Sequence, residues 1–148
     1  MLPRPEPNLL QAILDNPEIS VISTDESGKI RTFNRGAEEL LGYTAEEMIG
    51  KATPELWHDQ EETRQRGKEL TKDFGVKVDT GFHTYTTEAT ITDSPAAHVW
   101  TYIRKDGSRI PVVLAVSVLR DTHGKMCGYI GIAMRIPSRG TPIAAAAR

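Results

Sequence analysis

Apolar and polar residues alternate most regularly in the last third of the chain. Between Arg109 and Arg120 every second residue is a branched aliphatic one, and this period of two predicts a β-strand on which these residues share one face. Flanking segments rich in β-branched residues predict two more strands, at His98 to Arg104 and Lys125 to Arg135. We expect the middle strand to be covered on both sides, because its other face is also apolar, with Val113, Ala115 and Leu119.

A second pair of strands is predicted near the start of the chain. Ile19 to Thr24 is rich in β-branched residues, and Lys29 to Phe33 follows after the turn sequence Asp-Glu-Ser-Gly, so the two segments form a β-hairpin. The preceding segment, Leu9 to Leu14, has the spacing of a short amphipathic helix. A helix of this length is not stable alone, so it docks on the domain or on a partner chain.

The clearest local signals lie between these two groups of strands, in residues 30–51. Asn34 suits a helix N-cap, and Gly42 stands where a helix C-terminus favours a residue with positive φ. Thr44 and Glu47 have the spacing of a capping box. Two short helices are therefore expected directly after the first hairpin.

Further helices are expected before the last strands. Thr53 and Pro54 begin a short helical turn, and Gln60 to Phe74 is charged almost throughout with a narrow apolar stripe, which is typical of a surface helix. In residues 76–97 we expect a helix beginning near Thr80, because long structureless segments are uncommon in compact domains. The whole order predicts an α+β domain, with helices on one face of a five-stranded antiparallel sheet and a pocket between the layers.

Composition and charge narrow the class of protein. A chain of 148 residues predicts one domain, and a net charge of -2 gives no indication of nucleic-acid binding. The apolar runs are shorter than the ~20 residues that a membrane span needs, and no secretory signal is visible. The single cysteine, Cys127, excludes an internal disulfide, so a cytoplasmic protein is expected. We divide the chain into a leader with a helix (1–16), a domain (17–136) and a tail (137–148).

Three segments carry a family resemblance. They are FNRGAEELLGYTAEEMIGK from Phe33, RKDGSRIPV from Arg104, and GYIGIAM from Gly128. Together they resemble the PAS domains of bacterial multidomain sensors, over roughly Asp15 to Ile136. The resemblance implies a PAS fold.

The resemblance also implies sensing rather than catalysis. PAS domains bind a small molecule, a haem or a flavin between sheet and helices, and commonly dimerise through an N-terminal helix and the outer face of the sheet. They relay the signal to a kinase, cyclase or transcription regulator, as in two-component or cyclic-dinucleotide signalling. Where the family often has Asp-Ile-Thr leading into a signalling helix, this chain has Arg135-Ile136-Pro137, and proline disfavours that continuation. The output is therefore connected differently, or the domain is free-standing or excised.

The sequence motifs that indicate particular cofactors are absent or incomplete. The reactive-cysteine run of flavin-photoadduct relatives, Asn-Cys-Arg-Phe-Leu-Gln, is absent, and Cys127 is expected to pack at the start of the last strand. Haem relatives use a histidine in the region of His58, although the best-known ones have it further along, where this chain has residues 63–65. His58 beside Asp59 also fits a capping pair at the surface of a helix end. No zinc signature, phosphate loop or defined catalytic triad is present, so no enzymatic activity is expected.

Pocket residues are expected from both layers. On the strand His98 to Arg104, Val99 and Thr101 lie on the face with smaller residues, which suits a pocket wall or a tight core. Trp100 and Tyr102 lie on the other face and suit an edge, a dimer contact or a ligand rim. The candidate pocket residues are Ser23, Leu40, Leu41, Met48, Ile49, Trp57, Phe82, Thr101, Ile103 and Ser117. The candidate dimer contacts are Leu9, Leu10, Ile13 and Leu14.

The leading hypothesis is a sensory module that binds an unidentified small molecule and acts as a homodimer on an output domain in cis or in trans, without nucleic acid or membrane insertion. A ligand shifts such an equilibrium only if it binds the two states unequally. The alternatives are a ligand-free dimerisation or interaction module, and a haem-based gas or redox sensor that uses His58 as the iron ligand.

Overall fold

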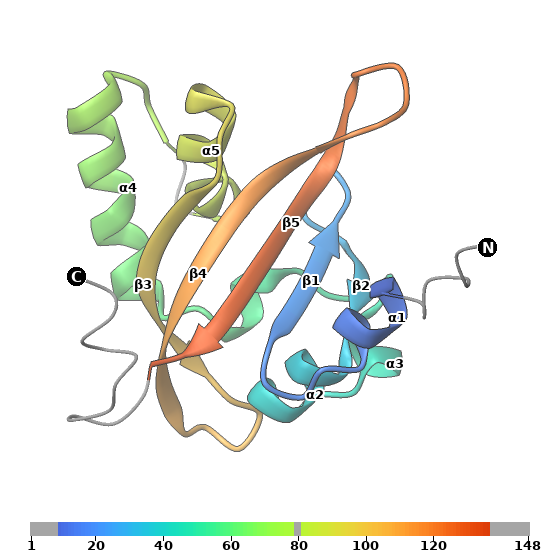
Figure 1. The fold of residues 1–148 in the computed structure, drawn as a ribbon. Coiled ribbons are helices and arrows are strands. Elements are labelled where there is room, and N and C mark those ends of the chain that lie inside the picture. The colour runs from blue at the N-terminus through green and yellow to red at the C-terminus, as the bar shows by residue number, and fades with distance from the viewer. Residues whose placement is uncertain (1–8, 79–80, 137–148) are drawn as a thin grey trace.

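The computed structural model describes residues 9–78 and 81–136. In this part of the chain five strands form one antiparallel sheet, in the order β2-β1-β5-β4-β3 (Figure 1). They are β1 (Ser20–Thr24), β2 (Ile30–Phe33), β3 (Ala96–Ile103), β4 (Arg109–Arg120) and β5 (Met126–Arg135). The first hairpin joins the last strand through β1 and β5, with Ser20 opposite Ala133, as the sequence predicts.

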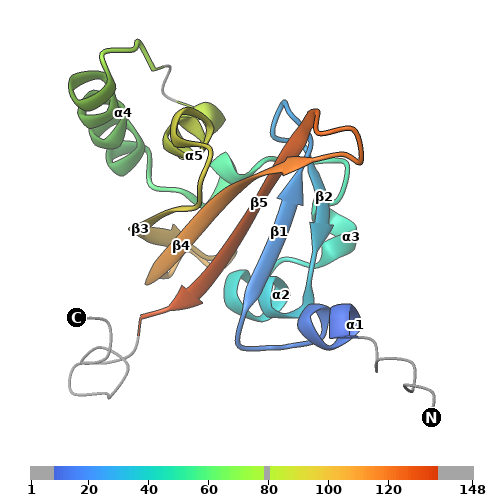
Figure 2. The ribbon, with the colours of Figure 1, turned by 45° about the horizontal axis from the view of Figure 1, so that its top comes forward.

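The helices lie in two groups beside the sheet. Figures 1 and 2 show α2 and α3 next to β1 and β2, and α4 and α5 next to β3 and β4. The helices are α1 (Leu9–Leu14), α2 (Arg35–Leu41), α3 (Ala45–Met48), α4 (Gln60–Phe74) and α5 (Thr87–Thr92), with the 3-10 helices η1 (Pro54–Trp57) and η2 (Phe82–Tyr85). The α+β fold with a five-stranded antiparallel sheet is confirmed. None of the described helices is long and apolar enough to cross a membrane.

Asn34 ties the start of α2 to the segments around it. Its Oδ1 accepts hydrogen bonds from the backbone N–H groups of Val21 (2.8 Å) and Ala37 (2.9 Å). Its Nδ2 donates to the carbonyl oxygens of Ile19 (2.9 Å) and Ile13 (3.3 Å). The N-cap of α2 is therefore also the junction between α1, β1 and the helical layer.

The ends of α2 and α3 follow the signals in the sequence. Gly42 ends α2 with a φ of 86°, and Thr44 and Glu47 form the reciprocal bonds of a capping box. In the first turn of α2, a Cβ added to Gly36 would lie 1.9 Å from the carbonyl oxygen of Ile19. Because only a bare backbone fits there, the glycine allows α2 to lie directly against the chain entering β1.

The two faces of the sheet are covered unequally. On the inner face Val112 and Leu114 are buried, whereas Val113 on the outer face is 42% exposed. The expectation that β4 is covered on both sides is therefore wrong for a single chain. The outer face carries a row of exposed apolar side chains, formed by Val99, Val113, Ile132 and Met134.

The segment that was hardest to interpret from sequence contains two short helices instead of one. The 3-10 helix η2 begins at Phe82 and α5 at Thr87, while Thr80, the expected start, lies outside the described residues. The threonine-rich sequence is accommodated because the hydroxyls of Thr87 and Thr90 donate to carbonyl oxygens four residues earlier, at 2.6 and 2.8 Å. The expected tail, residues 137–148, also lies outside the described part.

Candidate functional site

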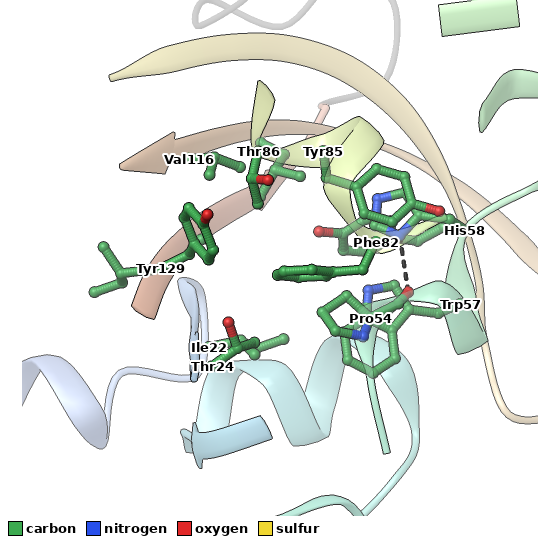
Figure 3. Close-up of a pocket in the computed structure, with 14 residues that line it drawn as sticks. Ile22, Thr24, Pro54, Trp57, His58, Phe82, Tyr85, Thr86, Val116 and Tyr129 are labelled. Carbon is green, nitrogen blue, oxygen red and sulfur yellow. Dashed lines mark hydrogen bonds between the residues drawn. The ribbon is translucent and has the colours of Figure 1, made fainter. Parts of the chain in front are cut away.

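A small cavity lies between the inner face of the sheet and the short helices η1 and η2 (Figure 3). Its volume is about 40 Å³, and aromatic side chains dominate its lining. The lining includes Thr24, Trp57, His58, Phe82, Tyr85 and Thr86, together with Tyr102 and Tyr129.

Phe82 occupies the centre of this group of residues. Figure 3 shows its ring between Tyr129 on one side and Trp57, His58 and Tyr85 on the other. The ring centroid lies 5.6 Å from that of Tyr129, in an edge-to-face arrangement, and the residue is 6% exposed. A side chain from η2 therefore borders the cavity between sheet and helices.

Tyr85 lies against His58 at the η1 end of the cavity. The two rings stack with centroids 3.8 Å apart and an interplanar angle of 18°. The Tyr85 hydroxyl shares a 2.9 Å hydrogen bond with the hydroxyl of Thr63 on α4. Burial raises the pKa of Tyr85 to about 12, so the phenol stays neutral and able to donate or accept.

His58 is a buried histidine with one hydrogen bond. Its residue exposure is 4%, and Nδ1 lies 2.9 Å from the carbonyl oxygen of Pro54. Nε2 has no hydrogen-bond partner among the described residues. Burial lowers the pKa of the imidazole to about 4, and the bond to Pro54 opposes this only in part. The ring is therefore neutral at neutral pH.

The interpretation of His58 and Asp59 as a surface capping pair is half wrong. Asp59 does cap α4, since its Oδ1 accepts from the backbone N–H of Glu62 at 3.0 Å. The backbone of His58 pairs with that of Tyr102 in an isolated antiparallel bridge. This pairing turns the His58 side chain inward. Trp57 beside it is 1% exposed, and its Nε1 approaches the Tyr102 hydroxyl without reaching regular hydrogen-bond geometry.

Polar contacts hold α4 and α5 against the edge strand β3. The Glu62 carboxylate accepts from the backbone N–H and the hydroxyl of Thr101, at 2.7 and 2.6 Å. Arg66 pairs with Glu88 of α5, and His98 on β3 lies 2.7 Å from the same carboxylate oxygen. These contacts lie outside the lining of the cavity and position the two helices beside it.

The sequence-predicted pocket residues divide into three groups. Trp57 and Phe82 line the cavity. Leu41 and Met48 are buried in the core without lining it, Leu40 is half-buried, and Ile49 is 42% exposed. The remaining candidates alternate with the inward-facing residues of their strands and do not line the cavity: Ser23, Thr101, Ile103 and Ser117.

The face of β3 was assigned the wrong way round. Trp100 and Tyr102 are 5% and 2% exposed and face the core, whereas Val99 is 65% exposed. Side-chain size was the available signal, because large aromatic rings gain the most from burial. Tyr129, Thr24 and Thr86 also line the cavity, and the sequence offered no specific signal for them.

The predicted dimer contacts lie on α1. Leu10 is 67% exposed and Ile13 42%, while Leu14 is half-buried. The side chain of Leu9 lies outside the described part of the structure. Cys127, expected to pack, is exposed.

The cavity does not fit a haem or a flavin in this conformation. Pockets for ligands of that size occupy roughly 300–1,000 Å³, whereas the free space here is about 40 Å³. The Nε2 of His58 has the right chemistry for iron, but Tyr85, Trp100 and Tyr102 pack around its ring. No cluster of three potential metal ligands occurs among residues 9–78 and 81–136.

Comparisons with known proteins agree with this geometry. The family model described as PAS fold matches residues 8–136, while a search of curated proteins finds no match. Among solved structures, a PAS domain from Colwellia psychrerythraea has a TM-score of 0.62 at 20% identity, covering 88% of this chain and 96% of that one. The PAS domain of an HTR-like protein from Haloarcula marismortui has a TM-score of 0.61 at 17% identity, with coverages of 86% and 88%.

A third similar structure is the light state of the blue-light photoreceptor Aureochrome1 LOV, with a TM-score of 0.57 at 18% identity and coverages of 88% and 91%. At these identities the structural likeness shows the fold alone. The family assignment comes from the sequence match, which extends over most of the 148 residues. The chain belongs to the PAS-fold family.

Proposed function

We propose that this chain is a sensory PAS domain that binds a small ligand between sheet and helices. The observation that carries the proposal is the position of Phe82. The ring comes from the four-residue helix η2 and lies between the layers beside the cavity, so a movement of η2 alone would enlarge the space there. A ligand can therefore take this space when η2 moves outward.

The sheet offers a route from the cavity to a partner. Leu114 and Tyr129 line the cavity from β4 and β5, and Val113 and Ile132 project from the opposite face of the same two strands. A ligand that changes the packing of the inner face alters the surface that carries the exposed apolar row. We propose that this row and α1 form a homodimer contact that passes the signal to an attached or partner kinase, cyclase or transcription regulator.

Native mass spectrometry of the full chain, purified without denaturation, tests ligand binding directly. We expect a bound small molecule, or a mass shift on exposure to a metabolite mixture, together with altered hydrogen–deuterium exchange in residues 81–92. If no molecule binds and exchange there is as slow as in α2, ligand sensing by this domain is disproved.

Light scattering tests the dimer contact. Val113→Asp places a charge in the centre of the exposed row, and we expect it to shift the protein from dimer to monomer. The matched control is Val76→Asp, a similarly exposed valine (38%) in the loop after α4. Equal molar masses for the two variants would contradict a dimer through the sheet.

A second candidate function is a ligand-free interaction module. It is favoured by the small volume of the cavity, about 40 Å³, which leaves the core nearly filled. The two functions differ in the expected behaviour of the unsubstituted protein. A sensor binds a small molecule with Phe82 in place, whereas an interaction module binds none, and a cavity made by Phe82→Ala takes a ring-sized molecule in either case.

A further inference from the structure

The hydrogen-bonding state of His58 follows from its one partner. The carbonyl oxygen of Pro54 can only accept, so Nδ1, at 2.9 Å, carries the proton and donates. Because burial lowers the pKa of the ring to about 4, it holds a single proton at neutral pH. Nε2 is therefore an unprotonated acceptor, buried in a residue that is 4% exposed and without a partner among the described residues.

The threonine hydroxyls of the cavity also present acceptors. The hydroxyl of Thr24 donates to the carbonyl oxygen of Asp25 at 2.9 Å. That of Thr86 donates to the carbonyl oxygen of His83 at 3.3 Å. Each hydroxyl has one proton, which it donates in these bonds. Each hydroxyl oxygen can therefore only accept a hydrogen bond from a ligand. A ligand that brings a hydrogen-bond donor matches these acceptors.

The lining also selects against charge. Among the described residues that line the cavity there is no lysine, arginine, aspartate or glutamate. A charged ligand would be buried without a counter-charge, which is strongly unfavourable. A matching ligand is therefore neutral.

Phe82 indicates the shape of the ligand. Its six-membered ring already lies in the space between the layers, with aromatic edges around it from Tyr129 and Tyr85 at centroid distances of 5.6 and 6.4 Å. A flat ring of similar size can make the same edge-to-face contacts when it replaces Phe82. A larger fused ring system would require displacement of the residues around it as well.

We infer that the cavity takes a neutral, ring-sized aromatic molecule that carries a hydrogen-bond donor, a phenol for example, and that the Nε2 of His58 accepts its hydrogen bond. This inference rests on the proposed sensory function and adds the chemical class of the ligand. A hydroxyl group suits the site in a second respect, because its oxygen can also accept from the Nε1 of Trp57, a buried donor without regular hydrogen-bond geometry to any described residue.

Phenol and toluene form the matched pair of probes, since they share a ring and differ in OH against CH₃. In the full-length Phe82→Ala protein we expect calorimetry to give phenol about tenfold tighter binding than toluene, the worth of one buried hydrogen bond. In the double variant Phe82→Ala/His58→Phe the order should reverse, because the phenol hydroxyl then loses its acceptor and its desolvation is uncompensated.

The outcomes separate the two proposals. Toluene binding as tightly as phenol to Phe82→Ala would overturn the assignment of His58, while ligand binding between the layers stands. If neither probe binds to Phe82→Ala, the ligand class fails, whereas the proposed sensory function fails only if native mass spectrometry of the unsubstituted protein also detects no bound molecule.

Wild-type protein provides a measurement that does not depend on the folding of a variant. ¹⁵N NMR of the histidine side chains should show His58 with a protonated Nδ1 and an unprotonated Nε2. Millimolar phenol should shift the Nε2 resonance, and toluene should leave it nearly in place. An Nε2 that is protonated, or that does not respond to phenol, contradicts the inference.

Discussion

Asn34 and His58, one buried polar side chain from each side of the helical layer, differ in how fully they are hydrogen-bonded. Beside β1 and β2, Asn34 is 5% exposed and uses both its oxygen and its nitrogen in hydrogen bonds to four backbone groups. Beside β3 and β4, His58 is 4% exposed but bonds through only one of its two nitrogens. Both residues are equally removed from solvent, so burial alone does not distinguish them.

The difference separates a side that fixes the fold from a side that leaves room for function. A buried polar group without a partner costs on the order of 1–3 kcal/mol, and such a cost is tolerated where a ligand or a movement can recover it. Asn34 belongs to the α2–α3 side, whose helix ends are all determined locally. His58 belongs to the α4–α5 side, where η1 and η2 enclose the cavity. The following predictions test this division.

The largest expected effect is at Asn34. Asn34→Ala leaves the N–H groups of Val21 and Ala37 and the carbonyl of Ile19 without their partner, so we expect a loss of about 4 kcal/mol in the free energy of unfolding. Chemical denaturation measures it. Asn16→Ala is the control, because Asn16 bonds only the nearby N–H of Glu18; similar losses for both variants would refute the central role of Asn34.

The next effect is the pH dependence caused by His58. Its pKa is about 4 in the folded chain against an ordinary value of 6.5, so below pH 6.5 the unfolded chain binds a proton that the folded chain does not. The free energy of unfolding should therefore fall as the pH is lowered from 6.5, by about 3 kcal/mol once the pH is below 4. Subtracting the profile of His58→Phe from that of the wild type isolates the effect. His123→Phe, at an exposed turn, should leave the profile unchanged.

A smaller effect is expected at the contact between α4 and β3. Glu62→Ala removes two hydrogen bonds to Thr101, and we expect a loss of about 2 kcal/mol because the acceptor is charged. Glu61→Ala removes only an exposed ion pair with Arg64 and should cost less than 0.5 kcal/mol, roughly the value of such pairs. Equal thermal stabilities for the two variants would show that Glu62 does not hold α4 in place.

The smallest effect concerns Tyr85. Tyr85→Phe keeps the ring stacked on His58 and removes the hydrogen bond to Thr63, which should cost about 1 kcal/mol. The informative measurement is hydrogen–deuterium exchange, which should accelerate in residues 81–92 and not in α2. Tyr43→Phe, on the other side of the layer, should change neither; uniform acceleration in both sides would remove the distinction between them.

The α2–α3 side could be predicted from the sequence because its signals are local. Asn34, Gly42 and the pair Thr44–Glu47 each determine a helix end through bonds to residues within four positions. The alternation along β4 likewise predicted a strand, although the expectation that both of its faces are covered was wrong, since Val113 is exposed. Such signals need no knowledge of which strands become neighbours.

The α4–α5 side could not be predicted in the same way. The inward direction of His58 depends on its pairing with Tyr102, which is far along the chain, and nothing local to Leu56 or Asp59 encodes that pairing. On β3 both faces carry apolar residues, so the period alone leaves the choice of face open. Side-chain size was the remaining signal, and the larger residues Trp100 and Tyr102 are the buried ones.

The contact between Gly28 and Phe82 limits which residues can stand at these two positions in related chains. It lies in the β1–β2 turn with a φ of 97°, and a Cβ added there would come within 2.6 Å of the Phe82 ring. Any side chain at position 28 would therefore occupy space that the ring now uses. In an alignment of chains with this fold, we expect the two positions to co-vary, with glycine at 28 accompanying an aromatic residue at 82 and a larger residue at 28 accompanying a small one.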